Sequence, residues 1–113
     1  MAYHHTDPLK RFTSQPLCFN SQVWHNNLKK LSRLPYKCGL KIFSNQLEDM
    51  IKVIKQHSTI EFRIDHMGWP HSITPEWFTE WTTQLEELKA LDNICFQLSA
   101  LECTFGMTGA ASQ

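Results

Sequence analysis

The apolar and polar positions of this chain follow two periods, one typical of strands and one typical of helices. Ile60, Phe62 and Ile64 are apolar at every second position, which predicts a half-buried strand. Between residues 44 and 55 the apolar side chains instead recur at steps of three and four, as they do on one face of a helix. We therefore expect a helix there, with Ser44 as its cap.

A turn and a second helix are predicted directly after the central strand. Gly68 permits a sharp change of direction, and the strand is expected to stop near His66. Thr74 can cap a helix, and Pro75 suits the first helical position because it has no N–H to leave unpaired. The apolar periodicity then continues to about residue 91, which gives the length of the expected helix.

Three more elements complete the pattern. We expect a helix over residues 21–34, capped by Ser21 and ended by Pro35, and a short strand over 39–43. Residues 94–100 fit either a strand, in which Ile94, Phe96 and Leu98 fall on one face, or a continued helix. The segments that begin at Leu40, Ile60 and Ile94 share one order of apolar and polar positions, and this favours the strand.

The sequence therefore predicts an α/β fold: one small domain of three helix-strand units with a short, mostly parallel sheet. Residues 21–105 are assigned to this domain. Residues 1–20 are expected to form an extended arm, whose apolar members, including Phe19, make docking plausible. Residues 106–113 are expected to form a flexible tail.

The shared order of the three segments resembles the leucine-rich repeat, whose idealised motif is LxxLxLxxNxL. Asn45 stands at the asparagine position of the first unit, whereas Asp65 and Ser99 replace it in the other two. The step from Ile60 to Ile94 exceeds the family's repeat length and requires an insertion. The resemblance implies an alternative fold, a short repeat arc that binds protein on its concave strand face.

Composition indicates a globular protein without a membrane segment. The chain has 113 residues, 42% of them hydrophobic, and a mean hydropathy of −0.36. No apolar stretch approaches the length of a membrane span, and the first residues lack the apolar core of a secretory signal. We therefore expect a cytoplasmic protein. The four cysteines form no CxxC pair, and Cys95 is expected in the core.

Charge is distributed unevenly, although the net charge is zero. Residues 1–55 are basic and the remainder is acidic, which can steer a partner, pair within the fold or join copies of the chain. Five basic side chains lie close in sequence and could contact phosphates, so a nucleic-acid-associated protein is one alternative function. They are Lys29, Lys30, Arg33, Lys37 and Lys41.

A second alternative is a metal-dependent enzyme. Asp65, His66 and His71 follow the central strand, where α/β proteins place their sites, and these residue types can ligate zinc or iron. A loop histidine without such a role is the simpler interpretation. No phosphate-binding loop, nucleophile elbow or HExxH motif is present, so no catalytic residue and no cofactor are assigned.

Aromatic side chains give the preferred functional hypothesis. Residues 68–81 hold three tryptophans beside acidic side chains, and one helix face cannot bury all the aromatic rings. We expect a non-enzymatic protein-binding module, of the inhibitor, immunity-type or adaptor kind. Self-association stays open as an alternative. The residues predicted to contact a protein partner are Trp69, His71, Trp77, Glu80 and Trp81.

Overall fold

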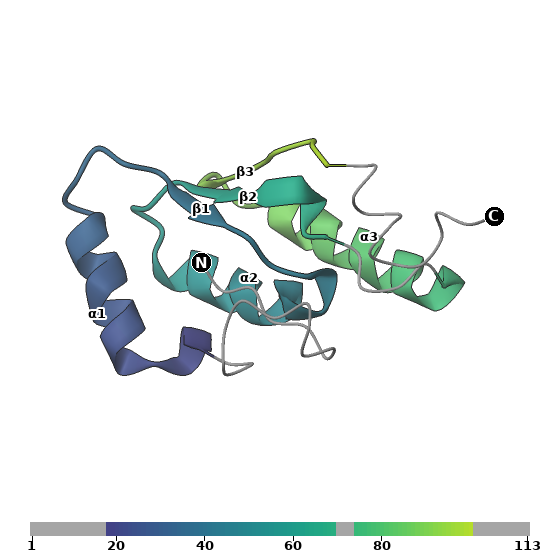
Figure 1. The fold of residues 1–113 in the computed structure, drawn as a ribbon, viewed down its shortest axis with the longest axis horizontal. Helices are drawn as coiled ribbons and strands as arrows, with labels where there is room; N and C mark the ends of the chain where they lie inside the picture. Colours follow the sequence, from purple (N-terminus) through teal and green to yellow (C-terminus); the bar gives the residue numbers. More distant parts are fainter. Residues whose placement is uncertain (1–17, 70–73, 101–113) are drawn as a thin grey trace.

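The computed structural model describes residues 18–69 and 74–100, and it confirms three helix-strand units with an all-parallel sheet (Figure 1). Each unit places a helix before its strand, as the sequence predicts. In chain order the elements are α1 (Gln22–Leu31), β1 (Cys38–Leu40), α2 (Leu47–Gln56), β2 (Phe62–Ile64), α3 (Pro75–Lys89) and β3 (Ile94–Phe96).

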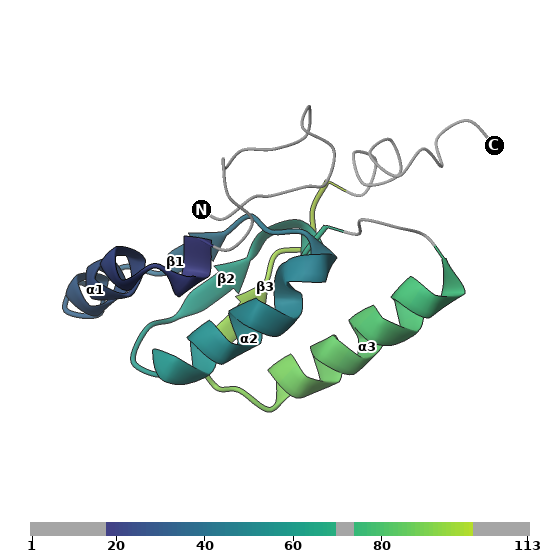
Figure 2. The same ribbon diagram turned by 90° about the horizontal axis from the view of Figure 1, so that it is seen from below.

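The sheet has the strand order β1-β2-β3, so consecutive units add consecutive strands. Phe62 is the register partner of Cys38 on one side and of Ile94 on the other. Helices α2 and α3 lie side by side on one face of this sheet (Figure 2). The other face carries the side chains of Arg63 and Cys95, both exposed.

Two of the three helices begin at the predicted caps. The Ser21 hydroxyl accepts a hydrogen bond from the Trp24 N–H, and Thr74 Oγ1 accepts one from the Trp77 N–H. The first helix ends at Leu31, about one turn before Pro35, which was expected to end it. Ser32 is its C-cap, and the Ser32 N–H donates to the Leu28 carbonyl. Helix α3 ends two residues before its predicted limit.

The prediction that Ser44 caps the second helix is wrong. Ser44 begins a 3-10 turn, Ser44–Gln46, and α2 starts only at Leu47. The Ser44 hydroxyl instead accepts a hydrogen bond from the Trp77 indole N–H. The predicted apolar face of α2 is confirmed, and the Lys52 ammonium pairs with the Glu48 carboxylate one turn earlier.

A tight turn follows β2, as the sequence predicts. The 3-10 turn Asp65–Met67 leads into Gly68, which has φ 65°. A side chain there would be strained by that φ, and its Cβ would lie 3.2 Å from a Leu47 methyl carbon. His66 and Met67 also have positive φ, and the Met67 N–H donates to the Gln97 carbonyl at 3.2 Å, which holds the turn against the third unit.

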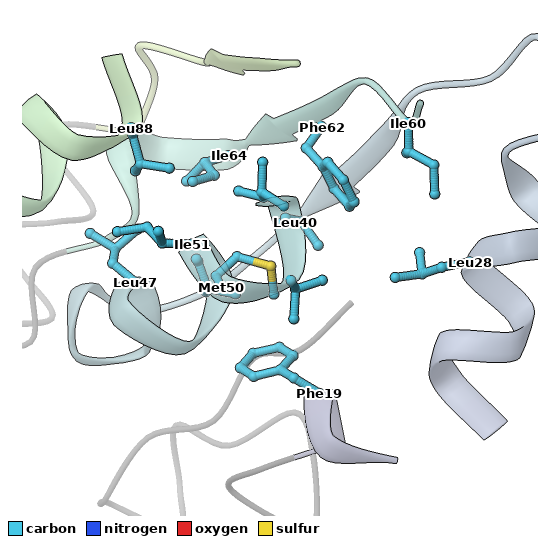
Figure 3. Packing of buried hydrophobic residues seen from close by; sticks show 13 residues of the cluster. Phe19, Leu28, Leu40, Leu47, Met50, Ile51, Ile60, Phe62, Ile64 and Leu88 are labelled. Atoms are coloured by element: carbon cyan, nitrogen blue, oxygen red, sulfur yellow. The ribbon is translucent and has the colours of Figure 1, made fainter. Parts of the chain in front are cut away.

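The core lies between the sheet and the helices (Figure 3). Phe19 belongs to it with 1% of its surface exposed, so part of the predicted arm docks as the sequence makes plausible. Residues 1–17, 70–73 and 101–113, including the predicted tail, lie outside the described residues. The buried apolar side chains are those of Phe19, Leu28, Leu40, Ile42, Leu47, Met50, Ile51, Val53, Ile54, Ile60, Phe62, Ile64 and Leu88.

The third strand differs from its prediction in length and in one side chain. It spans only Ile94–Phe96, because the backbone leaves the ladder after residue 97 bonds to β2. Cys95 is exposed rather than in the core, since Ile94 and Phe96 take the inward positions of the alternation. Within residues 18–69 and 74–100, no helix is long and apolar enough to cross a membrane.

Candidate functional site

The two tryptophans of α3 fasten this helix to the rest of the fold. The Trp77 indole N–H donates to Ser44 Oγ at 2.6 Å, and the Trp81 indole N–H donates to the Met67 carbonyl at 3.2 Å. The two rings stack with their centroids 5.4 Å apart. Both side chains are partly buried, so their indoles have a structural role as well as an accessible edge.

Trp69 lies over the turn that follows β2. Its ring stacks on His66, with centroids 4.7 Å apart, and on Phe43 at 6.1 Å. Its carbonyl accepts a hydrogen bond from the Ser44 N–H at 2.8 Å. Trp69 therefore covers the buried Phe43 ring from the side of the turn, and it is half-buried in doing so.

Among the described residues of the 68–81 stretch, the most exposed part of the aromatic surface belongs to α3. Phe78 is 55% exposed, and its ring lies 5.8 Å from that of Trp81. Glu80, which precedes Trp81 in the sequence, is also exposed. His71 lies outside the described residues. The structure thus brings Trp77, Phe78 and Trp81 together and presents mainly Phe78 and Glu80 to solvent.

An apolar groove of about 430 Å³ continues this surface between α3 and β3. Trp81, Leu85 and Leu88 line it from the helix, and Ile94, Phe96 and Leu98 line it from the strand and the residues after it. Leu98 is 80% exposed, the highest exposure among the large apolar side chains in the described parts. Glu86 and Lys89, an ion pair with atoms 3.4 Å apart, stand at the rim.

The strand beside this groove is an edge strand. In the described residues, β3 pairs with β2 on one side and with no strand on the other. The Asn93 carbonyl accepts from Phe62 N–H at 2.9 Å, and the Gln97 N–H donates to the Ile64 carbonyl at 2.9 Å. Because successive backbone groups of a strand point to opposite edges, the N–H and C=O groups of Ile94 and Phe96 point away from β2.

The sequence pointed to only part of this groove. It identified Trp81 through the crowding of aromatic side chains and placed Ile94, Phe96 and Leu98 on one face of a strand. It did not show that this strand lies at the edge of the sheet, because strand order depends on contacts between distant residues. Leu98 is the residue that could have indicated the groove, because this apolar side chain follows the last helix that covers the sheet.

Of the three predicted metal ligands, the structure describes Asp65 and His66, and these two do not converge on one site. Asp65 is buried, and its Oδ1 accepts a hydrogen bond from Arg63 Nε at 2.7 Å. His66 turns elsewhere, with its Nδ1 2.8 Å from the Ser99 hydroxyl. In residues 18–69 and 74–100, no three His, Cys, Asp or Glu side chains gather closely enough to hold a metal ion.

The predicted basic patch is divided by the fold. Lys29, Lys30 and Arg33 lie on α1 or in the turn after it, and all three are exposed. Lys37 pairs with Glu61 at 2.7 Å, and this hydrogen bond and the carboxylate charge raise the pKa of Lys37. Lys41 is exposed beyond the end of β1. The patch therefore offers fewer unpaired charges than its sequence suggests.

A pair of histidines joins α1 to the end of α2, and sequence reasoning missed it. His25 Nδ1 lies 2.8 Å from His57 Nε2, and the rings stack with centroids 5.1 Å apart. Burial, and then the neighbouring His25 and Lys29, lower the pKa of His57 from its ordinary value of 6.5. The pair borders a mixed polar hollow of about 570 Å³ between the two helices.

Comparison with known proteins adds no relative. No family model, curated protein or solved structure matches this chain. The resemblance to the leucine-rich repeat therefore stays a prediction.

Proposed function

We propose that this protein is a protein-interaction module that binds a partner through the groove between α3 and β3. The observation that carries the proposal is an apolar groove bordered by an edge strand, with Leu98 80% exposed at its mouth. Contiguous exposed apolar surface is costly in water, and proteins that keep it commonly use it to bind other proteins.

The proposal keeps the predicted aromatic surface in part. Trp81 lines the groove, and Phe78 extends the same side of α3 beyond it. A partner in the groove would thus contact the accessible aromatic side chains as well as the aliphatic ones. Aromatic residues within an apolar surface frequently contribute much of the binding energy of an interface.

A binding role also agrees with the use of the titratable side chains. Asp65 pairs with Arg63, His66 contacts Ser99, and His25 contacts His57, so each of these groups takes part in holding the fold. A module of this kind acts by occupying a partner's surface or by bridging two proteins, as an inhibitor, an immunity-type protein or an adaptor does.

The experiment compares two substitutions of exposed apolar residues. Leu98→Lys places a charge in the groove, whereas Val23→Lys changes a residue that is 69% exposed on α1. Since burying one leucine contributes about 1.5–3 kcal/mol, the first change should weaken binding roughly 10- to 100-fold. The second should leave binding unchanged, because Val23 does not line the groove.

The assay immobilises the full chain and both variants and identifies the proteins that each retains from a cell extract. We expect at least one protein retained equally by the unchanged chain and the Val23 variant and lost by the Leu98 variant. Retention that depends on Val23 but not on Leu98 would place the interface elsewhere. Identical sets on all three chains would contradict the proposal.

The nucleic-acid alternative has weaker support, because Lys37 is paired with Glu61 and the net charge of the chain is zero. The metal-dependent alternative has weaker support as well, since Asp65 and His66 are engaged with different partners.

A further inference from the structure

We propose that the hollow between α1 and α2 binds a small molecule that carries a phosphate group. The volume of the hollow, about 570 Å³, lies within the range of small-molecule sites in proteins. The turn Cys18–Asn20 contacts both helices and adds two uncharged side chains to the wall, those of Phe19 and Asn20. No residue that lines this hollow also lines the groove between α3 and β3, so the inference is independent of the proposed interface.

The charged side chains that line the hollow are mainly basic. Lys29 reaches it from α1 and forms no ion pair with a described residue. Lys52 and Asp49 reach it from α2 and pair with each other at 3.3 Å. Glu48, the other carboxylate bonded to Lys52, is not among the lining residues. Two ammonium groups and the histidine pair thus face one carboxylate, which is already paired.

The charges that act on His57 are positive. Burial is the first cause of the lowered pKa of His57, and His25 and Lys29 lower this pKa further because they disfavour another positive charge. Among the described residues, no carboxylate acts against them. An anion in the hollow would supply the missing negative charge and would raise the pKa of His57 again.

The hydrogen bond between the two rings determines how many donors the histidine pair can offer. His25 Nδ1 lies 2.8 Å from His57 Nε2, so one of these nitrogens carries a proton and the other accepts it. In the neutral pair, only one of the two remaining nitrogens, His25 Nε2 and His57 Nδ1, is an N–H. One further proton makes both of them N–H donors and leaves the bond between the rings intact. We therefore expect the site to take up as much as one proton when it binds an anion.

A phosphate group matches this set of donors better than a carboxylate does. Besides Lys29 and the two imidazoles, Asn20 and Gln56 contribute side-chain amides to the wall of the hollow. A carboxylate has two oxygens and one negative charge, whereas a phosphate monoester has three acceptor oxygens and nearly two negative charges. We therefore expect the ligand to be a small phosphate monoester.

The first probe is inorganic phosphate, titrated into the full chain while NMR records the ring-proton shifts of His25 and His57. Saturable shifts are expected at both rings, and none with sodium chloride at equal ionic strength. Lys29→Gln should weaken binding about tenfold, because a hydrogen bond to a charged group is lost. Lys30→Gln is the matched control: Lys30 is exposed on the same helix but does not line the hollow, so binding should not change.

The second probe is sulfate, because it stays a dianion over the pH range in which histidine titrates. A pKa of the pair that rises by about one unit on binding corresponds to an affinity about tenfold higher at about pH 5.5 than at about pH 8. The double variant His25→Gln, His57→Gln should bind sulfate equally at the two pH values. Acetate, which offers only a carboxylate, should bind at least about tenfold more weakly than phosphate does.

Four results would overturn the inference. Ring shifts that phosphate does not saturate would reject the site and leave the proposed groove interface untouched. Equal loss of affinity in the Lys29 and Lys30 variants would show attraction to the charged surface of α1 rather than binding in the hollow. A sulfate affinity that does not change with pH would remove the histidine pair from the site. Binding that appears only after Asp7→Asn would mean that the chain supplies the anion itself.

Discussion

The Asn93 side chain connects the third helix-strand unit to the second through hydrogen bonds. Its Nδ2 donates to the carbonyls of Ile54, His57 and Ile60, at 3.2, 3.3 and 3.1 Å. These three carbonyls belong to the end of α2 and the chain that leads into β2. The substitution Asn93→Ala removes the donor, while the Ile54 and His57 carbonyls still accept from the backbone N–H groups of His57 and Ile60.

The cost can be worked out from this geometry. The amide carries two hydrogens shared among three acceptors, and one hydrogen bond contributes about 1 kcal/mol net. Loss of both gives about 2 kcal/mol, and desolvation of the Ile60 carbonyl adds up to about 1 kcal/mol more where water does not reach it. We therefore expect Asn93→Ala to lower the free energy of unfolding by about 2–3 kcal/mol.

Urea unfolding measures this loss, which corresponds to a midpoint lower by roughly 1–2 M for a domain of this size. Asn45→Ala is the matched control, because Asn45 is exposed in its 3-10 turn and should change stability by less than about 0.5 kcal/mol. Equal effects of the two substitutions would refute the account of Asn93.

Three other features give expectations that simpler measurements can check. Trp77→Phe removes the N–H donated to Ser44 and should cost about 1 kcal/mol in urea unfolding; unchanged stability would contradict that contact. Because the pKa of His57 is lowered in the fold, the unfolded chain binds a proton at higher pH, so stability should fall on acidification below about pH 6.5. His57→Gln should flatten this pH dependence, and an unchanged slope would refute it. Iodoacetamide should modify the exposed Cys95 faster than Cys38, because burial raises the pKa of Cys38. Mass mapping of the modified peptides measures the two rates, and faster modification of Cys38 would contradict the expectation.

The sequence predicted those elements whose local pattern and packing agree. Helix α2 buries every residue of its predicted face, and Thr74 caps α3 as its neighbours indicate. The third strand was recovered because Ile94 repeats a spacing found earlier in the chain. For the two helices, the residues that decide the element lie within about two turns of each other.

Other features depended on contacts between distant parts of the chain. Ser44 is a favourable cap by residue type, but its hydroxyl instead accepts a hydrogen bond from Trp77, 33 positions away in the sequence. The His25–His57 contact spans 32 positions. No local pattern reveals such pairs, because each side chain has its usual polar character until the fold brings its partner close.

The candidate site likewise combines one feature that a local pattern predicted with others that depend on distant contacts. Trp81 was predicted from the local density of aromatic side chains, and it does line the groove. The groove itself requires knowing that β3 is an edge strand and that α3 leaves Leu98 uncovered. Asn45 was the residue closest to the repeat motif, whereas the asparagine that joins the units is Asn93, immediately before the strand.

Photo-crosslinking from the groove shows directly whether a protein partner binds there. A benzoylphenylalanine residue is placed at Leu98 in one full-length chain and at Val23 in another, both exposed positions. Illumination in cell extract, followed by mass spectrometry, shows which position touches another protein. If the groove is the interface, position 98 should form a specific covalent adduct, and position 23 should form none with the same protein. An adduct from position 23 alone would contradict it.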